Sequence, residues 1–290
     1  MKTPLLYKIS ALFRRIVDFV LFTSSFTALC AVALCMATER LFMGYVPVTF
    51  SPLHFFVIGC TLLVYNVHYL IKKSSVTLSD QYAWVQKHKY WNYTFLFAGA
   101  ALCAIFVFQL PKSVWEACLA LAAFSFAYSL PVLPFKNKHR LKDFGWLKIF
   151  LLAGIWTVVT AILPMLYWQQ SIQAYPYEIV MRFLFLFILC LAFDIRDQQV
   201  DLEAGIFTVP NKIGLLNTYS LISVLVLLFI FCSVAQYFRF SLPDRLIINI
   251  ISALFTLWAV HFVRKHPTDK NYLLLIDGQM LINALLLLLF

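Results

Sequence analysis

Residues 215–237 read LLNTYSLISVLVLLFIFCSVAQY, a run of 23 residues with no acidic or basic side chain. An α-helix rises about 1.5 Å per residue, so this run is long enough to cross the roughly 30 Å hydrocarbon core of a bilayer. The preceding residues, 193–214, read FDIRDQQVDLEAGIFTVPNKIG and hold four of the chain's 13 acidic residues. The two stretches together predict a membrane-spanning helix that follows an acidic loop.

The rest of the chain has the same character. It is 62% hydrophobic and 12% charged, with a mean hydropathy of +0.84, whereas soluble domains carry about 25% charged residues. We therefore expect an all-α, polytopic membrane protein whose residues 1–290 form a single domain. The expected nine spans are residues 16–36, 50–71, 91–110, 113–133, 146–167, 176–193, 215–237, 246–263 and 272–290.

The basic residues predict the orientation of these spans. With the N-terminus inside, eighteen of the 23 Lys and Arg residues fall on the inner side, as the positive-inside rule requires. The N-terminus and the loops after the second, fourth and sixth spans are therefore expected to be cytoplasmic. The same pattern explains the net charge of +10, so the expected partner is the lipid bilayer and not nucleic acid.

The acidic loop contains a spaced set of carboxylates. Asp194, Asp197 and Asp201 are three and four residues apart, which places them on one face of a helix. Neighbouring carboxylates repel one another unless a cation lies between them, and hard oxygen ligands suit Mg²⁺. Asp194 also follows an apolar span directly, where a charge is costly. The spacing predicts a magnesium site, and the alternative is a solvated acidic loop that pairs with nearby lysines.

Residues 193–214 also resemble the second aspartate-rich motif of the UbiA superfamily of intramembrane prenyltransferases, D-x-R-D-x-x-x-D-x-x-A-G-x-x-T-x-P-x-x-x-G. The matching residues are Asp194, Arg196, Asp197, Asp201, Ala204, Gly205, Thr208, Pro210 and Gly214. The resemblance implies a nine-helix bundle with active-site loops after the second and sixth helices. It also implies that the three aspartates are the catalytic residues, which hold Mg²⁺ against a polyprenyl diphosphate.

A shorter match follows the fourth span. Residues 128–136, YSLPVLPFK, resemble the family's Tyr–Ser…Pro…Leu–Lys–Arg stretch, whose lysine lies near the substrate diphosphate. The resemblance implies that Lys136 binds the diphosphate, and we assign Arg196 of the second motif to the same task.

The family's first motif, N-D-x-x-D-x-x-x-D, is degenerate in residues 66–74, which read NVHYLIKKS. Asn66 is kept, whereas the three aspartates are replaced by Val67, Leu70 and Ser74. We expect Lys72 and Lys73 to neutralise the diphosphate in their place, with Asn66 also in contact with it.

These patterns favour an intramembrane prenyltransferase that moves a prenyl group from a polyprenyl diphosphate to an aromatic or lipid acceptor. Loss of the first motif leaves a non-catalytic, isoprenoid-binding or scaffolding homologue as the alternative, and a transporter is the third hypothesis. Asp277, within the last span, is either functional or paired inside the bundle. His54 and His261 are expected to be hydrogen-bonded within the bundle.

Overall fold

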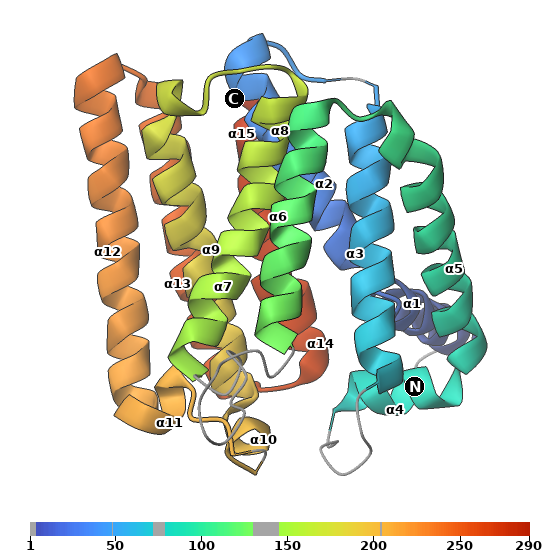
Figure 1. The fold of residues 1–290 in the computed structure, drawn as a ribbon. Coiled ribbons are helices and arrows are strands. Elements are labelled where there is room, and N and C mark those ends of the chain that lie inside the picture. The colour runs from blue at the N-terminus through green and yellow to red at the C-terminus, as the bar shows by residue number, and fades with distance from the viewer. Residues whose placement is uncertain (1–3, 48, 72–78, 130–144, 204) are drawn as a thin grey trace, which may run out of the picture.

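The structure is a computed structural model that describes residues 4–47, 49–71, 79–129, 145–203 and 205–290. These residues form helices and connecting turns and contain no strand. The long helices stand side by side as a bundle (Figure 1). Three short helices, α4 (Asp80–Lys87), α10 (Gln198–Glu203) and α11 (Val209–Ile213), lie at one end of the bundle, which we call the site end.

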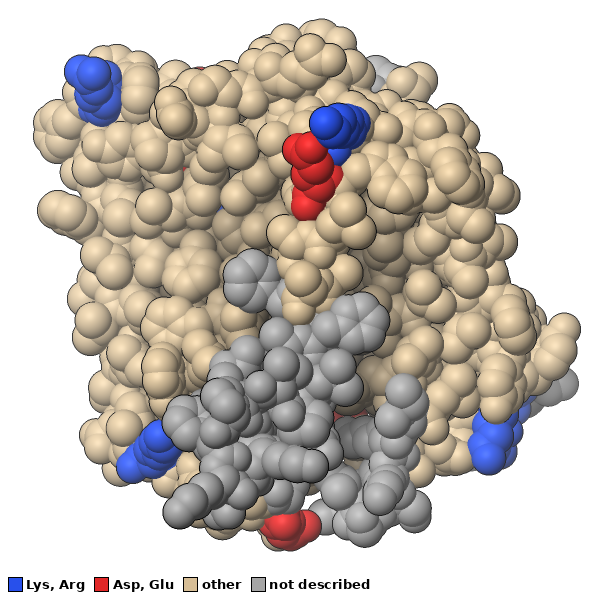
Figure 2. Space-filling view, viewed as in Figure 1, with Lys and Arg blue, Asp and Glu red and all other residues tan. Residues whose placement is uncertain are grey.

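Seven helical stretches of the described residues are long and apolar enough to cross a membrane. They are α2 (Ser25–Met43), α3 (Pro52–Ile71), α5 (Lys89–Phe106) with the turn after it, α7 (Gly145–Thr157) with α8 (Leu163–Tyr167), α12 (Leu215–Phe240), α13 (Pro243–Lys265), and α14 (Asp269–Asn271) with α15 (Gly278–Leu289). Figure 2 shows a face of the molecule on which the few charged side chains lie toward the two ends of the helices. The chain is therefore a multi-pass membrane protein.

The predicted count of nine spans is not confirmed. Two further helices, α6 (Lys112–Ser129) and α9 (Pro176–Arg196), stand in the same bundle but are not among the seven stretches. The predicted span that contains α6 ran to residue 133, and residues 130–144 lie outside the described part of the chain. α9 is 21 residues long but carries Glu178 and Arg182 in its first two turns.

The first predicted span, residues 16–36, is wrong in its bounds. A separate helix, α1 (Pro4–Phe22), ends before α2 begins at Ser25. Ser24 between them has a left-handed backbone with φ 62°, which a continuous right-handed helix excludes. The Thr23 hydroxyl donates a hydrogen bond to the Phe19 carbonyl at 2.7 Å and so satisfies one of the groups at the end of α1. The membrane-length helix in this region is α2.

Helices α3 and α5 approach each other closely at two glycines. A Cβ atom placed on Gly99 would lie 2.8 Å from the Gly59 carbonyl oxygen and 2.8 Å from the Leu63 nitrogen. A Cβ on Gly59 would lie 2.9 Å from the Gly99 oxygen. Small residues at such crossings are the usual means by which membrane helices pack backbone against backbone. These two glycines therefore fix the distance between α3 and α5.

We expect Gly99→Ala to lower stability by about 1–3 kcal/mol, because the added methyl group must push apart two backbones. The measurement is thermal unfolding of the purified protein in detergent. Gly154→Ala on α7 is the matched control, since nothing lies within 4 Å of its Cβ position and alanine favours a helix. Equal melting temperatures for the two variants would contradict the packing described.

The helices are also joined by buried polar side chains. Asn249 of α13 donates to the Ser233 hydroxyl of α12 at 2.9 Å, and Asn283 of α15 donates to the Ser252 hydroxyl of α13 at 3.0 Å. The Thr27 hydroxyl donates to the Asp277 carboxylate at 3.1 Å, which gives this acidic side chain a pairing role between α2 and the last span. Such bonds contribute to helix association where no water competes for the polar groups.

The two histidines differ in their surroundings. His54 is fully buried, accepts a hydrogen bond from the Ser51 backbone at 3.0 Å, and lies 3.1 Å from the Glu39 carboxylate. The expectation of a hydrogen-bonded position inside the bundle is confirmed for His54. It is wrong for His261, which is exposed on the outer side of α13.

Candidate functional site

Two carboxylates and one ammonium group meet at the site end of the bundle. Asp194 lies in the last turn of α9, Asp201 lies on α10, and Lys148 lies in the first turn of α7. The Lys148 Nζ atom is 3.3 Å from Asp194 Oδ1 and 2.9 Å from Asp201 Oδ2. Asp194 is 5% exposed and Asp201 is 8% exposed. A single positive charge therefore bridges two largely buried negative charges.

Asp197 faces a different cation. Its carboxylate accepts two hydrogen bonds from Arg196, at 2.7 Å from Nε and 3.0 Å from Nη2. The same guanidinium lies 3.9 Å from Asp269 and 4.9 Å from the centre of the Phe193 ring. This bidentate pairing fixes the orientation of both the Asp197 carboxylate and the Arg196 guanidinium. The structure thus brings Asp194 and Asp201 together at Lys148 and turns Asp197 toward Arg196.

The turn after α10 is shaped by glycines and local hydrogen bonds. Gly205 and Gly214 have φ values of 73° and 81°, in the left-handed region that glycine adopts readily. The Ile206 amide donates to the Asp201 carbonyl at 2.8 Å, and the Asn211 side chain donates to the Gln198 carbonyl at 3.1 Å. These contacts fold residues 198–203 and 205–214 back over the end of α9, which places Asp201 beside Asp194.

Gly145 brings α7 against this turn. A Cβ atom on Gly145 would meet the Phe207 carbonyl group and would lie 2.6 Å from the Thr208 nitrogen. No side chain fits there without moving the backbone of the turn. Because Lys148 is three residues further along α7, the absence of a side chain at Gly145 allows the ammonium group to reach both aspartates.

The carboxylates of this site fit a divalent cation in part. Asp194 Oδ2 is buried and has no hydrogen-bond partner among the described residues. The described residues contain no group of three or more His, Cys, Asp or Glu side chains arranged to hold a metal. Two converging carboxylates suit Mg²⁺, which keeps several waters and takes further oxygens from substrate phosphates. The donors that fit are Asp194 and Asp201, with Asp197 directed to Arg196.

Asn66 is fully buried among other helices. Its amide donates to the Leu62 carbonyl at 2.8 Å and to the Thr23 carbonyl at 3.3 Å, and its oxygen accepts from Asn92 at 2.7 Å. A contact between Asn66 and a diphosphate would require these hydrogen bonds to open, so in this structure the side chain joins α3 to α5 and to the turn between α1 and α2. The predicted diphosphate ligands Lys72, Lys73 and Lys136 lie outside the described residues.

Lys148 is the residue that the sequence analysis missed, because it counted there only toward the positive charge of a loop. A signal was present. A lysine in the first turn of an apolar helix is unfavourable next to the positive end of the helix dipole, so its position calls for a carboxylate partner.

The architecture defines the class of protein: an α-helical membrane bundle with a carboxylate–lysine cluster at one end. The pattern of the UbiA prenyltransferase family matches residues 84–285, and the chain belongs to this family. The match begins after the segment in which Val67 and Leu70 stand at first-motif positions.

Solved structures show the same fold. The chain is similar to a UbiA homologue from Archaeoglobus fulgidus bound to GPP and Mg²⁺, with a TM-score of 0.66 and 12% identity over 93% of this chain and 96% of that one. The same homologue bound to DMAPP and Mg²⁺ gives a TM-score of 0.62, with the same identity and coverage. Among curated proteins, no relative matches the chain.

We expect Lys148→Met to lower stability by about 3 kcal/mol, because it leaves two buried carboxylates without their cation. Thermal unfolding in detergent measures the loss. Adding Asp194→Asn and Asp201→Asn to this variant removes the repulsion and should recover most of the stability. Lys212→Met, at an exposed site, is the control. A triple variant as unstable as Lys148→Met would show that the ion bridge is not the cause.

Proposed function

We propose that this protein is an intramembrane prenyltransferase that binds a polyprenyl diphosphate at the site end and transfers the prenyl group to a hydrophobic aromatic or lipid acceptor. The observation that carries the proposal is the convergence of Asp194 and Asp201 on Lys148 in a chain of the UbiA prenyltransferase family. The archaeal homologue of the same fold binds GPP and DMAPP with Mg²⁺, which supports the same ligand class here.

Prenyl transfer begins with departure of the diphosphate, so negative charge must be stabilised on the leaving group. In the proposed function Asp194 and Asp201 would hold Mg²⁺, while Asp197 remains paired with Arg196. The metal would supply that positive charge when bound. We assign further diphosphate contacts to Arg196, Lys136, Lys72 and Lys73. In this proposal the prenyl chain extends from the site toward the apolar part of the bundle.

Lys148 has two tasks in this proposal. It neutralises the repulsion between Asp194 and Asp201, which keeps both carboxylates oriented toward one point. It also adds a fixed positive charge to a site from which the first-motif aspartates have been lost. The site therefore presents fewer carboxylates than the family's two motifs together, and the Lys148 charge lowers the positive charge that metal ions must provide.

The proposed orientation places the site end on the cytoplasmic side of the membrane. Lys87, Lys89, Lys148, Arg264 and Lys265 lie at or near this end, where α3, α9 and α13 end and α5 and α7 begin. A positive excess on one side is the feature that sets membrane topology. Diphosphate substrates would then enter from the cytoplasm.

We expect purified protein to bind radiolabelled geranyl diphosphate, and to bind it more tightly with Mg²⁺ than with a chelator. The Asp194→Asn/Asp201→Asn variant should bind at least roughly tenfold more weakly in Mg²⁺, because each charge-assisted contact contributes about 1.5–3 kcal/mol. Equilibrium binding in detergent measures both affinities.

Asp244→Asn, an exposed site at the start of α13 on the opposite end, is the control for this experiment and should leave binding unchanged. Equal binding by the native protein and the double variant would refute the assignment of the two aspartates. A folded native protein that binds no prenyl diphosphate of any chain length would refute the transferase proposal and favour the scaffolding homologue.

A non-catalytic, isoprenoid-binding homologue is the second candidate. It is favoured by Val67 and Leu70 in place of aspartates and by the buried amide pair of Asn66 with Asn92. The two candidates differ in whether bound substrate loses its diphosphate. Release of inorganic diphosphate together with transfer of the labelled prenyl group to an acceptor in membrane extract, both absent in the double aspartate variant, identifies the transferase. Binding without release identifies the second candidate.

A further inference from the structure

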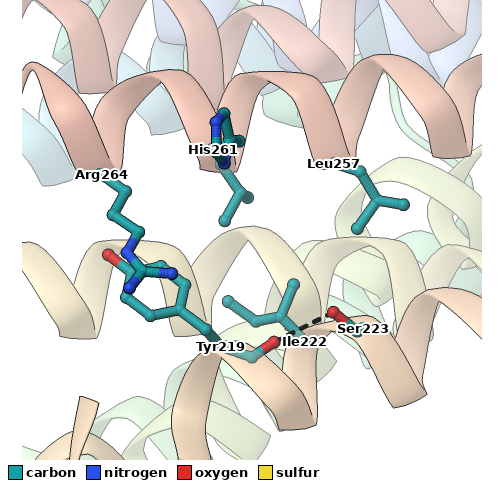
Figure 3. Close-up of a pocket in the computed structure, with 7 residues that line it drawn as sticks. Tyr219, Ile222, Ser223, Leu257, His261 and Arg264 are labelled. Carbon is teal, nitrogen blue, oxygen red and sulfur yellow. Dashed lines mark hydrogen bonds between the residues drawn. The ribbon is translucent and has the colours of Figure 1, made fainter. Parts of the chain in front are cut away.

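A groove runs between the outer surfaces of α12 and α13, at the site end but away from the aspartate cluster. Its volume is about 280 Å³. Tyr219, Ile222 and Ser223 line it from α12 (Figure 3). The α13 side is formed by Leu257, Val260, His261 and Arg264.

The floor of the groove is apolar and its rim is polar. Ile222 and Val260 are 1% and 5% exposed, whereas Ser223, His261 and Arg264 are exposed. Arg264 is the second-last residue of α13, and Leu257 lies seven residues deeper, about 10 Å along the helix axis. The groove therefore changes from cationic at the end of the helices to apolar toward the middle of the bundle, which is the polarity of an amphiphile that lies along the helices.

Arg264 is free to bind an anion. Its guanidinium carbon lies 4.6 Å from the centre of the Tyr219 ring, which holds the side chain over the groove (Figure 3). No carboxylate of the described residues forms an ion pair with it. His261 lies one turn deeper on the same face of α13 and adds a ring that can donate a hydrogen bond. A guanidinium with unused N–H groups has the geometry that phosphate recognises.

The surface around the groove is the kind that contacts lipid. Leu216 and Val224 on α12 and Leu254 and Trp258 on α13 are all exposed. Tryptophan is enriched at membrane interfaces, where its apolar ring and polar N–H meet the two environments. The groove thus opens to the bilayer, whereas Lys148 and its aspartates lie between α7 and α9.

We propose that this groove is a binding site for an anionic phospholipid of the surrounding leaflet. Arg264 and His261 bind the headgroup phosphate, and an acyl chain lies over Ile222, Val260 and Leu257. Basic pockets between membrane helices attract anionic headgroups because the phosphate exchanges water for fixed cationic donors. A free phosphate gains nothing from the apolar floor, so the occupant is a lipid. The proposal does not depend on prenyl transfer.

The test is native mass spectrometry of the purified protein with dioleoyl phosphatidylglycerol and with dioleoyl phosphatidylcholine. The native protein should retain phosphatidylglycerol in preference to phosphatidylcholine. Arg264→Gln should weaken that binding roughly tenfold, which corresponds to about 1.4 kcal/mol. Lys265→Gln makes the same charge change at the next residue, outside the groove, and should leave binding close to native.

A second variant tests whether the lipid binds in the groove itself or only to the positive surface charge. Ser223→Trp keeps Arg264 but fills the groove from its exposed rim, and it should also lose phosphatidylglycerol. Equal losses in Arg264→Gln and Lys265→Gln, or no loss in Ser223→Trp, would overturn the site in favour of general surface charge. Displacement of the lipid by an equal concentration of glycerol 3-phosphate would overturn the lipid as occupant, and displacement by geranyl diphosphate would assign the groove to the substrate.

Discussion

The bridge from Lys148 to Asp194 and Asp201 is the interaction on which the site depends. It joins the start of α7 to the end of α9 and to α10, which lie about fifty residues further along the chain. Two carboxylates this buried at the end of a membrane helix repel each other strongly unless a cation lies between them. The Lys148 ammonium group reaches both aspartates because Gly145 has no side chain, so that α7 lies directly against residues 207–208.

The two sides of the site end contribute differently. The α9–α10 side supplies carboxylates, whereas the end of α3 supplies Asn66, with its amide bonded to Asn92, and Tyr69, whose hydroxyl donates to Gln81 at 2.6 Å. Gln81 in turn binds Asp269, which lies near Arg196. Uncharged hydrogen-bonding groups on α3 and α4 thus lie near the place where the family's first motif carries aspartates, and the ion pair of Asp269 with Arg196 connects them to the second motif.

Polar groups elsewhere follow a simple division between the inside and the outside of the bundle. Inside, amides and hydroxyls of α12, α13 and α15 form hydrogen bonds with one another, and the Glu39 carboxylate lies 3.1 Å from the His54 ring. Outside, the helices expose leucine, valine and phenylalanine to the surrounding lipid. The groove at Arg264 combines the two kinds of surface, because a cation without a carboxylate partner among the described residues lies beside an apolar floor on the outside of the bundle. That combination is what marks it as a binding surface.

The sequence alone determined the class of protein and its family, because hydropathy and a motif of fixed spacing are local properties of the chain. It also located the acidic turn at residues 194–201. Only the tertiary structure decided that α1 and α2 are separate helices, since one left-handed residue at Ser24 leaves hydropathy unchanged. From their spacing alone, the three aspartates are equivalent. In the structure Asp197 pairs with Arg196, whereas Asp194 and Asp201 pair with Lys148. Charge partners depend on which helix ends lie side by side, and only the packing of the bundle fixes that.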